Sequence, residues 1–132
     1  MKILVVDDDQ FLREGLVSIL SGHDVTAVHT LQEGLNLVDE GPDTWDLVIV
    51  DLRLYPVWGP GLVEAIRDRS KRLHSRTMLW TGYPLRAHEK QVLQERFGVP
   101  VVDKMQVSTA WFHALLGCVR DGASHDDPRW PI

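Results

Sequence analysis

The 132-residue sequence has little cysteine, no excess of basic charge and no long apolar run. Its single cysteine, Cys118, excludes an internal disulfide and is typical of a reducing compartment. A net charge of −5 argues against binding to nucleic acid or to an anionic membrane, because both need a basic face. The N-terminal apolar run is too short for a signal peptide or a membrane span. We therefore expect a cytoplasmic protein with no nucleic-acid or membrane partner.

The length and composition predict a single globular domain. With 44% hydrophobic and 25% charged residues, the chain can form one hydrophobic core that needs no stabilising disulfide or structural metal. We expect this domain to span residues 1–121 and to be followed by a disordered polar tail over residues 122–132. The tail contains His125-Asp126-Asp127, and a disordered terminus is a better interpretation of that cluster than a metal site.

Short apolar runs alternate with apolar residues at helical spacing. The runs predict five strands, over residues 3–6, 25–28, 48–51, 77–80 and 99–102. The helical spacing predicts five helices, around residues 11–20, 31–38, 62–73, 87–97 and 111–119. This alternation requires parallel pairing with right-handed crossovers. The predicted fold is α/β, a doubly wound five-stranded parallel sheet with the flavodoxin-like order 2-1-3-4-5, and Pro100 places the fifth strand at an edge.

Polar residues stand where four of these strands end. Asp7 and Asp8 follow the first strand, Asp51 ends the third, Thr81 follows the fourth, and Lys104 comes just after the fifth. The first and third strands are neighbours in the predicted order, so their carboxylates should converge. Converging carboxylates repel one another, and Mg²⁺ prefers such oxygen ligands. Together with a lysine and a hydroxyl, this set is suited to holding a phosphoryl group, which an Asp can accept.

The motifs at these strand ends resemble those of the receiver domain of two-component response regulators. They are Val5-Val6-Asp7-Asp8, Val48-Ile49-Val50-Asp51-Leu52-Arg53, Trp80-Thr81-Gly82-Tyr83 and Asp103-Lys104, and the resemblance covers residues 1–120. It implies that Asp51 is phosphorylated. It also implies that Mg²⁺ is bound by Asp8, Asp51 and the backbone carbonyl of Arg53, with Asp7 acting through water. Thr81 would hydrogen-bond the phosphoryl group, and Lys104 would pair with it.

The resemblance also implies partners. A sensor histidine kinase or a phosphotransfer protein would donate the phosphoryl group, and an output partner would read the change. A homodimer through the fourth helix, the fifth strand and the fifth helix is a further expectation. The protein would not be an enzyme, except in assisting its own phosphorylation and dephosphorylation.

Three features depart from the family pattern. Met105 follows Lys104 where proline is usual, and Val101 takes the place of the aromatic residue of the switch. The loop after Asp51 is longer than usual, and its Trp58 lies either over the acidic pocket or on the surface. Arg53 and Tyr83 are large residues two positions beyond Asp51 and Thr81, respectively, so we expect slow water access and a long-lived phosphorylated form.

Other interpretations of the same residues remain. A degenerate receiver could serve as a phosphorylation-independent interaction module, which Val101 and Met105 favour. A phosphatase of the haloacid-dehalogenase type would need a second Asp where Arg53 stands. A flavin-binding module would need a phosphate loop rich in Ser, Thr and Gly after the first strand, and the sequence has none there.

Overall fold

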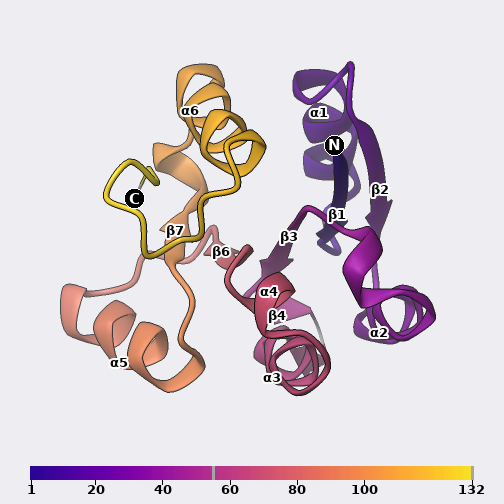
Figure 1. Cartoon of the computed structure of the whole chain (residues 1–132). Coiled ribbons are helices and arrows are strands. Elements are labelled where there is room, and N and C mark those ends of the chain that lie inside the picture. The colour runs from indigo at the N-terminus through magenta and orange to yellow at the C-terminus, as the bar shows by residue number, and fades with distance from the viewer. Residues whose placement is uncertain (55, 132) are drawn as a thin grey trace.

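A five-stranded parallel sheet forms the centre of the protein (Figure 1). The computed structural model describes residues 1–54 and 56–131. The strands of the sheet are β1 (Lys2–Val6), β2 (Asp24–Val28), β3 (Leu47–Asp51), β6 (Thr77–Thr81) and β7 (Val101–Asp103). Their order is β2-β1-β3-β6-β7, and every pairing is parallel. The predicted fold class and strand order are therefore confirmed, with the fifth parallel strand at an edge.

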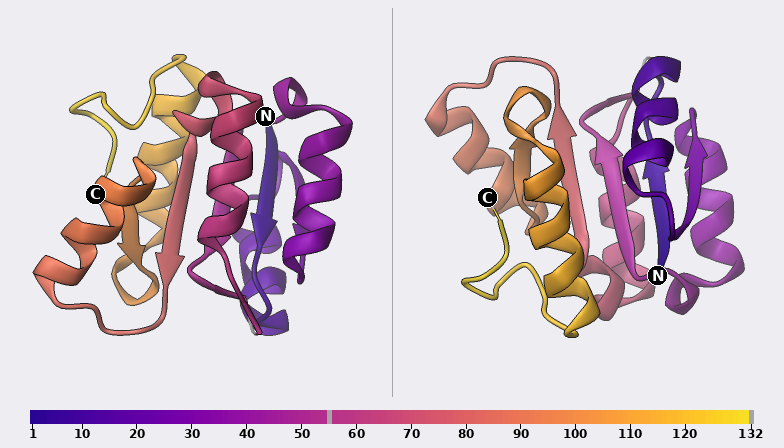
Figure 2. Two further views of the ribbon diagram at one scale, coloured as in Figure 1. Left: turned by 90° about the horizontal axis from the view of Figure 1, so that it is seen from below. Right: turned by 90° about the horizontal axis from the view of Figure 1, so that it is seen from above.

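Helices cover both faces of the sheet (Figure 2). One face carries α1 (Gln10–Ile19) and α6 (Thr109–Arg120), and the other carries α2 (Leu31–Glu40), α3 (Pro60–Arg69) and α5 (Ala87–Phe97). The short elements are η1 (Pro42–Thr44), α4 (Lys71–His74) and η2 (Lys104–Gln106). In the described part of the chain, none of the helices combines the length and the apolarity that crossing a membrane requires.

Local chemistry sets where these helices begin and end. The side chains of Asp9, Thr30 and Ser108 each accept a hydrogen bond from the backbone N–H three residues later, which starts α1, α2 and α6. Gly98 ends α5 with φ 67°, a conformation that glycine adopts without strain. These residue types are the ones that commonly cap helices at these positions.

The number of helices was predicted wrongly. The third predicted helix is interrupted at Ser70, whose backbone is extended with φ −154°. The Ser70 side chain accepts a hydrogen bond from the backbone N–H of Leu73, so it starts a separate α4 and brings the helices to six among the described residues. The loop after β3 also pairs with itself, as β4 (Arg53–Leu54) and β5 (Val57–Trp58) form an antiparallel ribbon. Such short strands contain no alternation that a sequence pattern could reveal.

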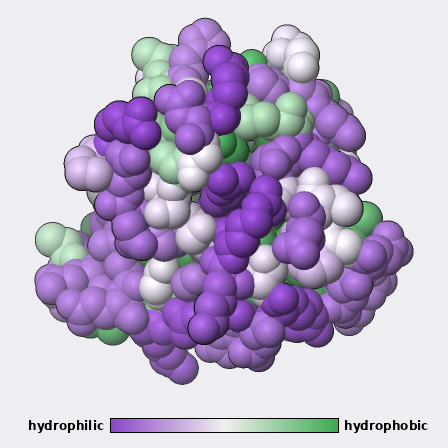
Figure 3. All heavy atoms as spheres, in the orientation of Figure 1, coloured by the Kyte–Doolittle hydropathy of each residue, from purple (hydrophilic) through white to green (hydrophobic). Residues whose placement is uncertain are grey.

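The core lies on both sides of the sheet. All five residues of β3 are buried, and its side chains alternate between the two apolar clusters. Val48 and Val50 face α2, α3 and α5, whereas Leu47 and Ile49 face α1 and α6. Cys118 is a buried free thiol in the cluster on the α1 and α6 side of the sheet. The outer surface in the view of Figure 1 is mainly hydrophilic (Figure 3).

Residues 122–131 do not form the disordered tail that their polar composition suggested. They fold back against the domain, and Trp130 is only 2% exposed. The backbone N–H of His125 donates a hydrogen bond of 2.9 Å to the carbonyl of Ser75. Burial of the Trp130 side chain outweighs the polar composition of the segment. The residues that bury it lie far away in the sequence, so the sequence of residues 122–131 alone does not predict this burial.

Candidate functional site

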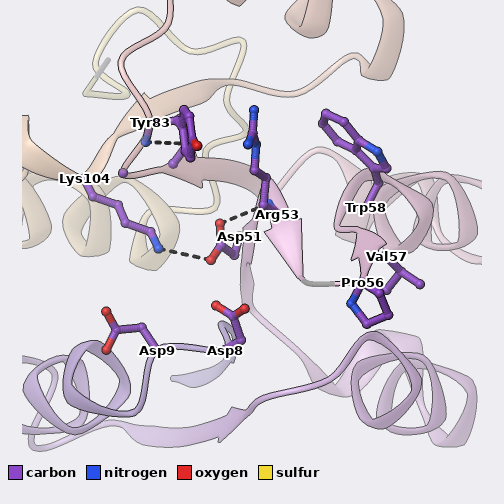
Figure 4. A pocket seen from close by; sticks show the side chains of 11 residues that line it. Asp8, Asp9, Asp51, Arg53, Pro56, Val57, Trp58, Tyr83 and Lys104 are labelled. Atoms are coloured by element: carbon purple, nitrogen blue, oxygen red, sulfur yellow. Dashed lines mark hydrogen bonds and ion pairs between the residues drawn. The ribbon is translucent and has the colours of Figure 1, made fainter.

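A pocket opens at the carboxyl ends of β1, β3 and β6, where a doubly wound sheet places its ligand sites (Figure 4). Its volume is about 520 Å³. Acidic residues from the ends of β1 and β3 line the pocket, and the Lys104 side chain reaches in to contact them. Arg53, Trp58 and Tyr83 stand at its rim. The pocket therefore brings together residues from four separate loops.

The three predicted carboxylates converge. Asp7, Asp8 and Asp51 each offer an oxygen atom, and these atoms lie within 4.8 Å of one another. Asp7 is completely buried, Asp51 is 6% exposed, and Asp8 is open to solvent. In Figure 4 the Asp8 carboxylate points toward Asp51. Two of the three negative charges are thus held out of water, which is unfavourable without nearby positive charge.

Lys104 supplies part of that charge. Its Nζ lies 2.7 Å from Asp7 Oδ2 and 3.1 Å from Asp51 Oδ2. Burial alone would lower the pKa of Lys104, but the hydrogen bonds and charges of Asp7 and Asp51 outweigh burial and raise it. The lysine is therefore a permanent cation at this end of the sheet, in the position that its motif predicted.

One lysine does not neutralise the pocket. Burial, followed by the charge of Asp7, raises the pKa of Asp51 to about 6, although Lys104 and the backbone N–H of Arg53 act in the opposite direction. That N–H donates to Asp51 Oδ1 over 3.1 Å. A pocket with three converging carboxylates and one lysine fits a hard divalent cation such as Mg²⁺. The donor set that the sequence predicted is thus chemically suited to the ion.

Thr81 completes the predicted set. It ends β6, is 3% exposed and lines the pocket. Its hydroxyl oxygen accepts a hydrogen bond of 3.0 Å from the backbone N–H of Tyr83, which orients the side chain. The structure therefore gathers Asp7, Asp8, Asp51, Thr81 and Lys104 around one space.

Aromatic residues and one arginine form the rim of the pocket. The Arg53 guanidinium lies 3.7 Å from the centre of the Tyr83 ring and 5.9 Å from the centre of the Trp58 ring. Arg53 and Trp58 face each other in the β4–β5 ribbon, which explains why the longer loop brings them together. Trp58 is 59% exposed, so it lies at the pocket and on the surface at once. The rim is built by cation–π contacts.

Two supporting residues had no clear sequence signal. A Cβ atom at Gly59 would lie 1.7 Å from the backbone oxygen of Asp51, so only glycine fits there. Arg13 donates a hydrogen bond of 2.7 Å to the backbone oxygen of Asp7. Gly59 belongs to a Pro- and Gly-rich run that marked a loop but did not reveal this close approach. Asp9, which had no site role, accepts a hydrogen bond from the backbone N–H of Leu12 and starts α1.

The departures from the family pattern have local structural consequences. The backbone N–H of Met105 donates a hydrogen bond of 2.8 Å to Asp103 Oδ1, and a proline at this position would lack that N–H. This bond holds the η2 turn that begins at Lys104. Val101 is buried, and a cavity of about 80 Å³ remains beside it, lined also by Thr81 and Tyr83. Lys104 therefore contacts Asp7 and Asp51 although no proline follows it. Val101 leaves the 80 Å³ cavity beside Thr81 unfilled.

Comparisons with known proteins agree with this geometry. Residues 3–104 match the model of the response regulator receiver domain family. No protein with a curated function matches the sequence significantly. Similar solved structures share the fold at low sequence identity. One, a response regulator receiver domain protein from Clostridium thermocellum, is 21% identical, with a TM-score of 0.73 and 92% of each chain covered.

Two other solved structures are similar to the chain over most of its length. A CheY-like receiver domain protein from Methanospirillum hungatei JF-1 is 22% identical, with a TM-score of 0.75 and coverage of 92% of this chain and 94% of that one. A response regulator from Burkholderia pseudomallei, solved with a phosphorylated aspartic acid, a calcium ion and citrate, is 23% identical. Its TM-score is 0.71, with 91% of this chain and 69% of that chain covered. The family match covers most of the sequence, and this chain therefore belongs to the response regulator receiver domain family.

Proposed function

We propose that this protein is a phosphorylation-dependent signalling switch in which Asp51 accepts a phosphoryl group from a histidine kinase or a phosphotransfer protein. The observation that carries the proposal is the convergence of Lys104 with a buried Asp51 and two further carboxylates in one open pocket. Receiver domains are generally signalling proteins rather than enzymes, and this chain would assist only its own phosphorylation and dephosphorylation.

The pocket would hold Mg²⁺. Receiver domains typically bind this ion in an acidic pocket. The protein's ligands would be Asp8, Asp51 and the backbone carbonyl of Arg53, with Asp7 acting through water. When bound, the ion would neutralise the charge of the carboxylates and of the incoming phosphoryl group. The raised pKa of Asp51 supports this assignment, because burial and the charge of Asp7 together outweigh the single positive charge of Lys104.

Asp51 would act as the nucleophile. One carboxylate oxygen forms a bond to phosphorus while the bond between phosphorus and the donor's imidazole nitrogen breaks, so the histidine leaves with the electron pair. Oδ1 is held by the Arg53 backbone N–H and Oδ2 by Lys104, which fixes the carboxylate for this attack. Lys104 would then pair with a phosphoryl oxygen, and Thr81 would donate a hydrogen bond to another.

The signal would leave through the loops that follow β3 and β6. These loops carry Arg53 and Tyr83, which are stacked at the rim of the pocket. Output would come through a partner protein or through self-association by α5, β7 and α6. A degenerate receiver that acts only as an interaction module remains the second candidate, because the buried Val101 cannot supply the usual aromatic readout.

A phosphodonor assay tests the proposal. The purified protein is incubated with Mg²⁺ and a small-molecule phosphodonor, and its intact mass is followed with time. We expect addition of one phosphoryl group to the wild type and none to Asp51→Asn. Asp68→Asn is the matched control, because Asp68 is exposed on α3, away from the pocket. An unmodified wild type would favour the interaction module.

A further inference from the structure

A buried tryptophan lies between the two strands that lead to the facing charges of the pocket. Trp80 of β6 pairs in register with Asp51 of β3 on one side and with Val102 of β7 on the other. Its carbonyl oxygen accepts a hydrogen bond of 2.8 Å from the backbone N–H of Leu52. The backbone of Trp80 is therefore held from both sides, directly before the end of β6.

The Trp80 side chain contacts the cation of the pocket. It is completely buried and belongs to the apolar cluster on the α1 and α6 side of the sheet. Residues in register on neighbouring strands point to the same face, so the carboxylate of Asp51 leaves the sheet on this side too. Lys104 Nζ lies 5.1 Å from the centre of the Trp80 ring and 3.1 Å from Asp51 Oδ2. The ammonium thus contacts the indole and the carboxylate at once.

Lys104 enters the pocket from a part of the fold that restrains it weakly. It follows β7, which has three residues and lies at the edge of the sheet, and Met105 rather than proline comes next. Its aliphatic chain passes Gly82, which has no side chain to pack against it, and a Cβ atom there would lie 3.7 Å from Lys104 Cδ. Among the described residues, the Trp80 indole is the aromatic ring over which the ammonium lies.

Packing alone does not account for a tryptophan at position 80. The indole N–H of Trp80 is buried without a hydrogen-bond acceptor among the described residues, and burying an unpaired donor is unfavourable. A leucine or a phenylalanine would fill an apolar position without that penalty. The face of an indole, however, attracts an ammonium more strongly than other aromatic rings do, and most strongly when the cation is shielded from water. The Lys104 side chain is only 14% exposed, so it meets this condition.

We propose that Trp80 is a positioning residue for Lys104, and that its indole face holds the ammonium beside Asp51. The inference rests on the proposed function, because Lys104 is the cation that would pair with the incoming phosphoryl group. Trp80 itself would not touch that group and acts only through the lysine. A cation that is already in place when the donor arrives need not be ordered during the transfer, which speeds the reaction.

Phosphorylation rates of matched variants test the inference. With a small-molecule phosphodonor and Mg²⁺, Trp80→Leu should be phosphorylated roughly 3–30-fold more slowly than the wild type, as expected for the loss of a cation–π contact to a shielded cation. Trp80→Phe keeps an aromatic face and should recover part of the lost rate. Met78→Ala truncates another completely buried side chain of the same strand and cluster and should keep the wild-type rate. Intact mass measures the rates, and circular dichroism verifies that each variant is folded.

A second readout requires no phosphorylation. In chelator, the ring current of the indole should displace the side-chain proton resonances of Lys104 in proton–carbon NMR spectra, and Lys104→Met identifies those resonances by their absence. Trp80→Leu should return them to the positions of an ordinary lysine. If the wild type takes up no phosphoryl group, the proposed function fails, whereas this spectrum still decides whether Trp80 holds Lys104.

Four results would overturn the inference. They are a folded Trp80→Leu with the wild-type rate, a Trp80→Phe as slow as Trp80→Leu, a Met78→Ala slowed to the same degree, and Lys104 resonances that Trp80→Leu does not move. If Trp80→Leu does not fold, tryptophan is replaced throughout by 5-fluorotryptophan, which keeps the shape of the indole but makes its face less electron-rich. The rate should then fall in the wild type and stay unchanged in Trp80→Phe. Equal effects on both proteins would also overturn the inference.

Discussion

The two strands that supply the facing charges of the pocket differ in how firmly they are held. β3 has five buried residues and is paired with β1 and β6, and it ends on Asp51. β7 has three residues at the edge of the sheet, and Lys104 follows it. Acid and lysine meet within 3.1 Å, yet only the acid comes from a strand fixed on both sides. Under the proposed function, the acceptor Asp51 therefore belongs to the centre of the sheet, whereas its partner Lys104 belongs to the edge.

Two of the three departures from the family pattern follow the same division, whereas the third, the longer loop, comes after β3. The strands β1 and β3 keep the full set of acidic residues. Val101 and Met105, by contrast, lie on or next to β7. At the edge, Met105 stands where proline is usual, and its backbone N–H donates a hydrogen bond to the Asp103 side chain. Changes at the centre should therefore affect stability and chemistry more than changes at the edge.

The largest effect should come from removing the buried charge of Asp51. Its pKa is about 6 in the folded protein against 3.8 ordinarily, so between these values the folded state binds more protons than the unfolded state. The free energy of unfolding should then fall as pH rises from about 4 to 6, by about 3 kcal/mol at most. In chelator, Asp51→Asn should lack this decline and exceed the wild type in stability at pH 7. Urea denaturation at several pH values measures the difference.

The Asp51 prediction has an internal control. Adding Mg²⁺ at pH 7 should stabilise the wild type, since an ion that binds only the folded state shifts the equilibrium toward it. Asp51→Asn should respond much less. A difference in free energy of unfolding between the wild type and Asp51→Asn that stays constant between pH 4 and 6 in chelator would contradict the electrostatic account, because the lowered pKa values of His23 and His74 affect both proteins alike.

The next effect should arise at Gly59, which lies against the backbone of β3. In Gly59→Ala the new methyl group would overlap the Asp51 backbone oxygen, so the chain must shift. We expect a loss of about 1–3 kcal/mol in the free energy of unfolding, together with slower phosphorylation. Gly117→Ala is the matched control, because its Cβ meets no atom within 4 Å. As a substitution inside α6, it should stabilise the protein by up to about 1 kcal/mol. Equal stability of the two variants would rule out the close approach.

A smaller effect is expected at the edge. Met105→Pro removes the N–H that donates to Asp103 Oδ1, which should cost about 1 kcal/mol in thermal or urea denaturation. Met105→Ala keeps that N–H and should be neutral, because the Met105 side chain is 84% exposed. Phosphorylation of Asp51 should survive both changes. If Met105→Pro abolished it, the edge would be as important as the centre, and the division between them would fail.

The smallest effect should be kinetic. Arg53→Ala combined with Tyr83→Ala removes the stacked pair at the rim and opens the pocket to water. The phosphorylated form should then hydrolyse roughly 2–5-fold faster, since a cation–π contact contributes about 0.5–1 kcal/mol. Val92→Ala on α5 is the control, because that side chain is exposed outside the pocket. Decay of the phosphorylated protein by mass spectrometry measures the rates, and an unchanged half-time would eliminate the rim as a barrier to water.

Much of the fold and the pocket could be predicted from short stretches. The run that ends on Asp51 is apolar throughout because both faces of β3 are covered, and strand order then placed Asp7 and Asp8 beside it. These predictions succeed because the burial of a strand shows in its own residues, and parallel pairing brings the carboxyl ends of neighbouring strands together. Even the edge position of the fifth strand followed from Pro100.

The remaining features depend on contacts between distant residues. The burial of Trp130 needs a cluster assembled from strands and helices far earlier in the chain. The glycine at position 59 is required by the Asp51 backbone, which no local pattern shows. Ser70 both ends α3 and starts α4, and the apolar spacing of Ile66 and Leu73 concealed this break. Sequence patterns therefore predicted the charged residues of the pocket, but not the residues elsewhere in the fold that depend on distant contacts.

The most direct test of the central claim is to locate the phosphoryl group on the chain. The protein is treated with a small phosphodonor and Mg²⁺, digested, and its peptides are sequenced by mass spectrometry, with a chelator-treated sample beside it. We predict modification of Asp51 alone, and none in chelator. Modification of any other residue, or equal labelling with and without the divalent ion, would contradict the account.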